Sequence, residues 1–190
     1  MNKERQVIEP GTIVFFSGYV EGKELEPLSG KSLIIVIKGD LTLDEDLYFA
    51  GDLYVDGNIN GESIDSIAID GSLNCNGEID IRNICITGDF KVYDHIEAYD
   101  ICVDGDFYAD CAVSALKIKV GRCFWTLDVD STSISVGEDF SCESVDANDN
   151  DIIVAGDFES EGNVSADFIN VLGKMHVAGT INANEIKVGY

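Results

Sequence analysis

The chain has 190 residues, 45% of them hydrophobic, which is enough to bury a core and indicates one domain. Its 36 Asp and Glu residues against 12 Lys and Arg give a formal net charge of −24. Such a charge argues against nucleic acid or an anionic membrane surface as a partner and favours a basic protein. The sequence has no apolar run long enough to span a membrane, and its start, MNKERQVIEPGT, lacks the apolar segment of a secretory signal. We therefore expect a cytoplasmic protein.

The first third of the chain is the least regular. Residues 1–33 contain both prolines, Pro10 and Pro27, and show no repeat, so they are predicted to form an N-terminal cap. Residues 35–43 then read as a truncated coil, and residues 47–59 as a fuller one. All residues after the cap, 34–190, are predicted to form the repeat domain, which includes these two coils.

From Ile67 onward the repeat is explicit. Each unit starts with Ile, carries Ile or Val two residues later, and in most units carries Phe six residues later. The units follow one another at intervals of 16 to 18 residues. The isoleucines that start them are Ile67, Ile84, Ile101, Ile118, Ile134, Ile152, Ile169 and Ile186.

Within each unit apolar and polar residues alternate, which is the period of a β-strand and not of a helix. A unit of this length is too short for a helical repeat and fits one coil of three short strands stacked about 4.8 Å from the next coil. The sequence therefore predicts an all-β, single-domain β-helix, a solenoid of about nine coils of about 17 residues. Its inward columns would hold the aliphatic residues and Phe.

Three units contain the word Gly-Asp-Phe, at residues 88–90, 105–107 and 156–158. Glycine there suits a bend, because a bend needs either positive φ or close approach of two backbones. The following Asp suits the same corner, because its carboxylate can accept local backbone N–H groups. A calcium-binding ladder is the rival interpretation, but Ser72, Cys123 and Lys174 interrupt the Asp column. We therefore expect a structural corner and no metal site.

No catalytic constellation is evident. The two histidines, His95 and His176, fall on distant units, so the sequence predicts a non-enzymatic protein without catalytic residues or cofactors. Six cysteines without a CxxC pair indicate free, mostly buried thiols. Cys85 and Cys102 are 17 residues apart and are predicted to stack on neighbouring coils, either as two small residues or as a disulfide.

The acidic residues and the outward aromatic residues indicate a candidate protein-binding surface. Residues 39–81 hold eleven acids and residues 123–173 hold twelve, with no Lys or Arg in either range. These acids either keep the protein soluble or form a surface for a basic protein. Tyr108 and Trp125 are expected to be adjacent on one face, with Asp128 and Asp130 close by, as the centre of an interface. The predicted partner-binding residues are Tyr108, Trp125, Asp128, Asp130, Glu138, Asp139, Glu143, Asp146, Asp149 and Asp151.

The words ITGDFKVYDHIEAYDICVDGDF (residues 86–107) and VAGDFESEGNVSADFINVLGKMHVAGTINANEIKVGY (residues 154–190) resemble the bactofilins, polymer-forming cytoskeletal β-helix proteins of bacteria. The likeness covers about residues 47–190 and concerns the coil-building residues. It implies a right-handed, roughly triangular β-helix and end-to-end filaments formed without nucleotide.

Two functional hypotheses follow from these observations. The first is an acidic binding protein that occludes a basic protein partner, such as an immunity protein or inhibitor of a toxin nuclease or of a nucleic-acid-binding enzyme. The alternative is a bactofilin-like structural protein that self-associates through its coil ends.

Overall fold

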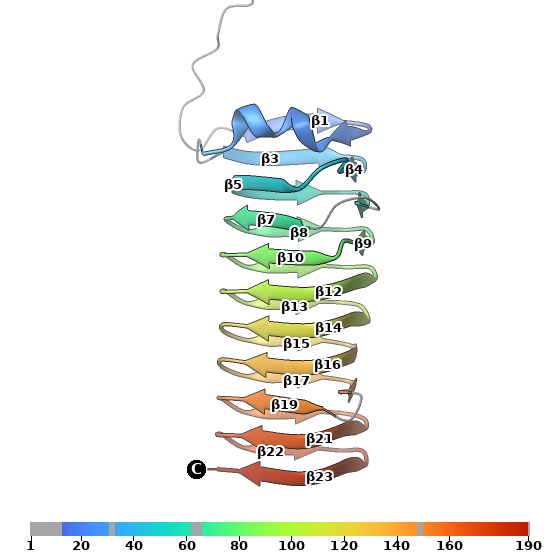
Figure 1. Ribbon diagram of the computed structural model, residues 1–190, viewed down its shortest axis with the longest axis vertical. Helices are drawn as coiled ribbons and strands as arrows, with labels where there is room; N and C mark the ends of the chain where they lie inside the picture. The colour runs from blue at the N-terminus through green and yellow to red at the C-terminus, as the bar shows by residue number, and fades with distance from the viewer. Residues whose placement is uncertain (1–12, 31–32, 62–65, 148–149, 190) are drawn as a thin grey trace, which may run out of the picture.

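The computed structural model describes residues 13–30, 33–61, 66–147 and 150–189. Every strand pairs in parallel with strands of the neighbouring coils, and the result is a β-solenoid of about ten turns with ~17-residue coils. Followed from the N-terminus, each coil runs right to left in front and returns behind, which is a right-handed turn (Figure 1). The predicted all-β solenoid is confirmed. None of the helices in the described ranges has the length and apolarity needed to cross a membrane.

Each coil has three sides, which we call side 1, side 2 and side 3 in chain order. Side 1 is formed by the first half of β5 (Leu47–Val55), by β7 (Ser66–Asp70), β10 (Asn83–Ile86) and β19 (Asp151–Val154), and by the second halves of β12 (Ile96–Val103), β14 (Val113–Val120), β16 (Asp128–Val136), β21 (Val164–Val171) and β23 (Ile181–Val188). Side 2 is formed by β1 (Ile13–Ser17), β3 (Leu33–Lys38), the second half of β5, β8 (Leu73–Cys75), β11 (Phe90–Val92), β13 (Phe107–Ala109), β15 (Phe124–Thr126), β17 (Phe140–Cys142), β20 (Phe158–Ser160) and β22 (Met175–Val177). Side 3 is formed by β2 (Val20–Glu21), β4 (Leu41–Thr42), β6 (Ile59–Asn60), β9 (Ile79–Asp80), β18 (Ser144–Asp146) and the first halves of β12, β14, β16, β21 and β23.

The core consists of columns of like residues that run along the axis. On side 1, the eight isoleucines that start the units stand in register from Ile67 to Ile186, as predicted. On side 2, successive Phe rings from Phe90 to Phe158 stack 4.8–5.0 Å apart and are fully buried. Burying a side chain of this size contributes about 1.5–3 kcal/mol. Repetition of these columns is what holds consecutive coils together.

Side 3 contains two core residues that the sequence pattern missed. Val129 and Val145 continue its inward column in register with Val113 and Val164. The corner ahead of each is shorter than in the other units, so both lie closer to the preceding Phe than the regular spacing predicts. The inward column itself is therefore unbroken.

The N-terminal segment differs in part from the predicted cap of residues 1–33. Ile13–Ser17 pairs with residues of β3, and Val20–Glu21 pairs with β4, so the ladder already begins within that segment. Two 3-10 helices, η1 (Gly22–Glu24) and η2 (Glu26–Leu28), then take the place of a strand on side 1 above β5. This replacement explains why the coil over residues 35–43 reads as truncated. Residues 1–12 and 31–32 lie outside the described residues.

The replacement segment is anchored to β5. The backbone N–H of Gly30 donates to the carbonyl of Ala50 at 3.1 Å, and the N–H of Ala50 donates to the hydroxyl of Ser29 at 3.1 Å. Leu25 is fully buried between the helices and the core. The two hydrogen bonds satisfy both backbone groups of Ala50, on a part of β5 that no preceding strand covers.

The Gly-Asp corners join consecutive coils. A Cβ added to Gly105 would lie 2.5 Å from the carbonyl oxygen of Gly88 and 2.5 Å from a carboxylate oxygen of Asp89. Close approach of two coils, and not positive φ, therefore explains the glycine at this corner. The carboxylate of Asp89 in turn accepts the backbone N–H of Asp106 at 3.0 Å. The Asp bond is thus not local, as the sequence suggested, but reaches the next coil.

Candidate functional site

The three sides present different chemistry to solvent. The outward column of side 1 contains no acid: its members are Tyr48, Ala68, Cys85, Cys102, Lys119, Ser135, Ile153, Asn170 and Lys187. The outward column of side 2 contains Glu159 as its one acid: its members are Phe15, Val36, Tyr54, Asn74, Lys91, Tyr108, Trp125, Ser141, Glu159 and His176. The negative charge of the chain is therefore carried mainly by side 3 and by the corners.

The corner between sides 2 and 3 carries one exposed acid on each of eight successive coils. We call this row the acidic ridge, and its members are Asp40, Asp56, Glu78, Asp94, Asp110, Asp128, Glu143 and Glu161. Within the described residues Lys38 is the one Lys or Arg of this corner, and its ammonium pairs with Asp56 at 2.7 Å. The remainder of the ridge presents carboxylates without an interspersed Lys or Arg.

Side 3 extends the acidic surface next to the ridge. Asp80 and Glu97 stand in register on neighbouring coils, as do Asp130 and Asp146, and all four are exposed. Neighbouring coils are about 4.8 Å apart, so like charges in these positions repel one another. A cationic partner would relieve that repulsion.

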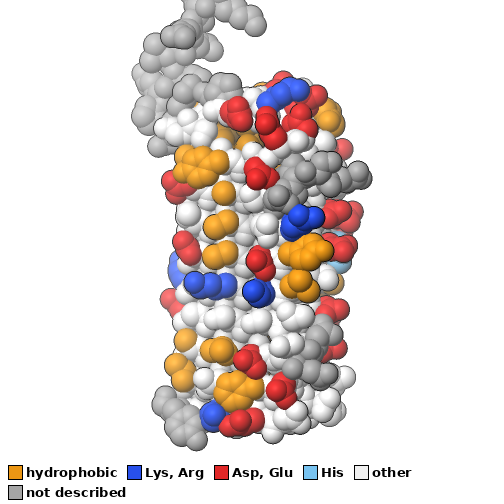
Figure 2. Space-filling model, viewed as in Figure 1, with side chains coloured by type: hydrophobic (Ala, Val, Ile, Leu, Met, Phe, Trp, Pro, Cys, Tyr) orange, Lys and Arg blue, Asp and Glu red, His pale blue; other side chains and the backbone are white. Residues whose placement is uncertain are grey.

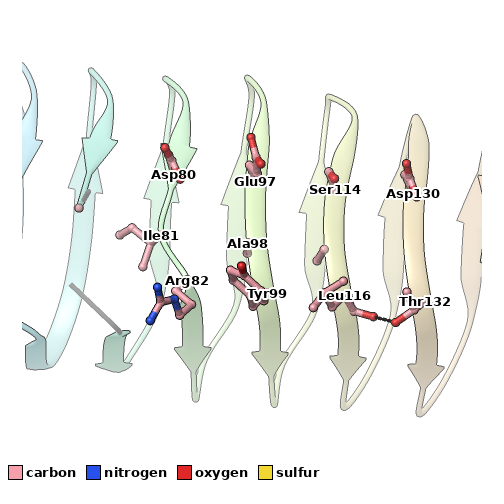
Figure 3. Close-up of a pocket in the computed structure, with 12 residues that line it drawn as sticks. Asp80, Ile81, Arg82, Glu97, Ala98, Tyr99, Ser114, Leu116, Asp130 and Thr132 are labelled. Carbon is pink, nitrogen blue, oxygen red and sulfur yellow. Dashed lines mark hydrogen bonds between the residues drawn. The ribbon is translucent and has the colours of Figure 1, made fainter. Parts of the chain in front are cut away.

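A shallow groove of about 490 Å³ follows the outer face of side 3. Figure 3 shows two rows of side chains along it: an upper row of Asp80, Glu97, Ser114 and Asp130, and a lower row of Arg82, Tyr99, Leu116 and Thr132. In the lower row the Arg82 guanidinium lies 5.5 Å from the centre of the Tyr99 ring. The acidic residues of the upper row suit a basic segment, and Tyr99 and Leu116 of the lower row suit the apolar stem of a Lys or Arg side chain, whereas Arg82 adds a positive charge at one end of the groove.

An aromatic cluster borders the ridge on side 2. The rings of Tyr108 and Trp125 stack at 4.5 Å with an interplanar angle of 6°, and Tyr93 lies 6.0 Å from Tyr108. Partial desolvation, followed by the charge of Asp110, raises the pKa of Tyr108. The Tyr108 hydroxyl therefore remains a neutral hydrogen-bond donor beside the carboxylates.

The structure divides the ten predicted partner-binding residues among several surfaces. Tyr108 and Trp125 are adjacent, as expected, and Asp128 and Glu143 lie near them on the acidic ridge. Asp130 and Asp146 lie around the corner on side 3, although Asp130 was expected to lie beside the aromatic pair on side 2.

The remaining predicted residues lie elsewhere. Glu138 and Asp139 occupy the corner between sides 1 and 2, where the Asp139 carboxylate accepts the backbone N–H of Asp157 at 2.8 Å. Asp151 begins β19 at the corner between sides 3 and 1, and Asp149 lies outside the described residues. The predicted residues that the structure places away from the aromatic face are thus Asp130, Glu138, Asp139, Asp146 and Asp151.

Several residues of the acidic surface were not predicted from the sequence. Each unit up to the one that contains Phe158 carries an acid three to five residues after its Phe-column position, and this regularity was the available signal. The missed ridge residues are Asp40, Asp56, Glu78, Asp94, Asp110 and Glu161, with Tyr93 beside them.

The buried thiols and the two histidines do not come together in one site. Burial raises the pKa of Cys75, Cys111 and Cys142 to about 12 in each case, so these thiols are held neutral. His95 lies at the ridge corner and His176 is outward on β22, on well-separated coils. The described residues contain no group of three or more His, Cys, Asp or Glu positioned to hold a metal ion.

Comparisons of the chain with protein-family models, with curated proteins and with solved structures found no match. Its functional assignment therefore depends on the chemistry of its surfaces.

Proposed function

We propose that this β-solenoid is a non-enzymatic acidic binding protein that occludes a basic protein partner, as an immunity protein or inhibitor of a toxin nuclease or nucleic-acid-binding enzyme would. The observation that carries the proposal is the acidic ridge, with one exposed carboxylate on each of eight successive coils. At about 4.8 Å per coil the ridge extends roughly 34 Å. A basic surface that receives the phosphates of a nucleic acid strand could receive these carboxylates in their place.

Two parts of the surface would contribute differently. The carboxylates of the ridge and of side 3 would pair with Lys and Arg of the partner and accelerate its approach. The stack of Tyr108 and Trp125 would supply the desolvated aromatic centre that commonly dominates the binding energy. Because many of the charge pairs would remain near solvent, salt should weaken the complex.

A charge-matched pair of variants tests this proposal, with an arginine-rich peptide and a basic nuclease as probes. The ridge variant replaces Asp94, Asp110 and Asp128 by Asn. The control variant makes the same change of charge at the corner between sides 1 and 2, with Asp70→Asn, Asp104→Asn and Glu138→Gln. Calorimetric titration at low salt should show binding by the parent protein, at least about tenfold weaker binding by the ridge variant and a much smaller effect in the control. No binding by the parent, or equal losses in both variants, would contradict a binding role for the ridge.

Self-association through the coil ends is the second candidate, and it is supported by the last described coil. Ile186 and Val188 are 45% and 41% exposed, whereas Ile169 and Val171, one coil earlier in the same columns, are fully buried. Among the described residues β23 pairs with β21 alone, so its other edge presents backbone donors and acceptors. A second copy of the chain could cover both the apolar end and this edge.

Sedimentation over a range of concentrations tests the second candidate. Association should be abolished by Val188→Glu, which places a charge at the end of the core, and retained by Asn170→Glu, which places the same charge on the outer face of side 1. A protein that remains monomeric at every concentration would rule out this candidate and leave the first one standing.

A further inference from the structure

Side 1 carries a pair of cysteines that the proposed binding surface does not use. Cys85 on β10 and Cys102 on β12 stand in register on neighbouring coils, both directed outward. Cys85 is exposed and Cys102 is half-buried, both are free thiols, and the two side chains are in hydrogen-bond contact. Two surface thiols are therefore held side by side by the ladder itself.

The spacing of the pair is compatible with a covalent bond. In-register residues on neighbouring parallel strands have Cα atoms about 4.8 Å apart, within the range of roughly 4.4–6.8 Å that disulfides span. Closing the bond requires the two sulfur atoms, which are already in hydrogen-bond contact, to approach to bonding distance.

The surroundings of the pair are also distinctive in so acidic a protein. Lys119 follows Cys102 in the same outward column, and Lys117 stands in register with Asp100 at the adjacent corner. Figure 2 shows this face: a vertical row of hydrophobic side chains (orange, a class that includes Cys) is followed along the axis by side chains in the blue of the Lys and Arg class. Lys119 therefore offers an anionic reagent a cationic side chain next to the thiols, against the opposing charge of Asp104, which also acts on Cys102.

We propose that Cys85 and Cys102 form a reversible dithiol site, which closes to an intercoil disulfide by exchange with a low-molecular-weight anionic disulfide such as oxidised glutathione. The thiolate of Cys85, the more exposed sulfur, attacks the disulfide, forms a mixed disulfide and releases one thiol. Cys102 then loses its proton and attacks the mixed disulfide at the sulfur of Cys85, which releases the second thiol. The protein loses two protons and two electrons, and the small disulfide is reduced to two thiols.

The environment of Cys102 suits the second step. Burial, followed by the nearby Cys85 and the charge of Asp104, raises the pKa of the Cys102 thiol in spite of the opposing charge of Lys119, and this disfavours direct attack by Cys102 on a reagent in solution. Once a mixed disulfide is present on Cys85, the sulfur of Cys102 is already beside it. Proximity then makes the second attack intramolecular and fast.

Mass spectrometry of the intact protein after exposure to oxidised glutathione tests the site. The parent protein should lose the mass of two hydrogen atoms and retain no glutathione, and peptide mapping should link Cys85 to Cys102. Cys102→Ser should instead retain one glutathione, because the resolving thiol is missing. Cys123→Ser, which removes the other half-buried cysteine, should close like the parent. A parent protein that stays unmodified, that retains glutathione or that forms its link through Cys123 would overturn the proposal.

A second experiment tests the role of the local charge. Lys119→Ser should slow closure by oxidised glutathione several-fold and leave closure by cystamine, a cationic disulfide, unchanged or faster. Equal slowing with both reagents would contradict electrostatic attraction at the site. Because the thiol pair and the acidic ridge lie on different sides, the oxidised protein should bind the basic probes as the reduced protein does.

Discussion

The carboxylate of Asp89 accepts a 3.0 Å hydrogen bond from the backbone N–H of Asp106, which occupies the same corner position one coil later. Asp106 then accepts the N–H of Cys123 at 3.2 Å, and Asp157 accepts the N–H of Lys174 at 2.7 Å. Each carboxylate thus satisfies a donor at a bend where the strand ladder is interrupted. The repeated Gly-Asp word therefore joins consecutive coils, through a hydrogen bond from the backbone of one coil to the Asp carboxylate of the coil before it.

Removal of one such acceptor should destabilise the solenoid measurably. Asp89 is half-buried, and Asp89→Ala leaves the N–H of Asp106 without this partner, so we expect a loss of about 1–2 kcal/mol in the free energy of unfolding. Asp89→Asn retains an oxygen acceptor and should cost less. Urea unfolding followed by circular dichroism measures both. Asp104→Ala, which removes an acid of the same corner outside the Asp column, should change stability little; an equal loss in that variant would assign the effect to net charge.

The Phe column should contribute most strongly to stability. The ring of Phe124 stacks between Phe107 and Phe140 at 4.8 and 4.9 Å and is almost completely buried. Phe124→Ala should therefore cost about 3–5 kcal/mol, and Phe124→Leu should cost less, because Leu73 already occupies this column. Denaturant unfolding gives the comparison. Trp125→Ala, at the adjacent outward position, is the control, and a loss there as large as that of Phe124→Ala would disprove the role of the buried column.

Buried thiols should make stability depend on pH in alkaline solution. Burial raises the pKa of Cys75 from 9.0 to about 12, so the folded state holds a proton that the unfolded state releases above pH 9. The stabilisation from this neutral thiol is present below about pH 9 and is lost as the pH rises toward 12, by up to about 1.4 kcal/mol per pH unit. Cys75→Val, which matches Val55 and Val92 in the same column, should remove the share of this dependence that Cys75 contributes and leave the shares of Cys111 and Cys142. Unfolding midpoints of the two proteins between pH 8 and pH 11 should diverge; parallel curves would contradict the prediction.

The aromatic cluster should dominate the binding of a basic partner, if the proposed function holds. Trp125 is 36% exposed and stacks on Tyr108 at the edge of the acidic ridge. Trp125→Ala should weaken binding of the basic nuclease by tenfold or more, since truncated aromatic hot spots commonly cost about 2 kcal/mol or more. Tyr48→Ala removes an exposed aromatic residue from side 1 and should have no effect. Titrations at two salt concentrations measure affinity; equal affinities at both would argue against the charged contacts.

Much of the fold could be predicted because burial repeats along the chain. Ile101, Val103 and Phe107 occupy inward positions that recur in each coil, and a residue that must be buried leaves a visible period. The repeat spacing did not predict the inward residue where a corner between two strands has a different length, as in the corner before Val129. It also failed in Ile13–Ser17, where a strand pairs with β3 without belonging to a unit of the regular length.

The candidate site was less predictable than the fold. Tyr108 and Trp125 could be paired from their equal positions in consecutive units, and the structure stacks their rings. Asp130 could not be placed, because the expectation depended on where the chain bends between Trp125 and the next strand. Trp125 lies on β15, which ends at Thr126, and the bend that follows moves Asp130 on β16 to another side of the coil.

The sequence by itself therefore determined the coil, its inward columns and the alternation of its strands, because solvent exclusion constrains the same positions in every unit. The tertiary structure alone decided which acids share a surface. An outward residue is free of the burial constraint, and its neighbours are set by the register of the ladder and by the length of each corner. Those two features bring Asp94, Asp110 and Asp128 into one ridge and leave Cys85 and Cys102 together on a side without acids in its outward column.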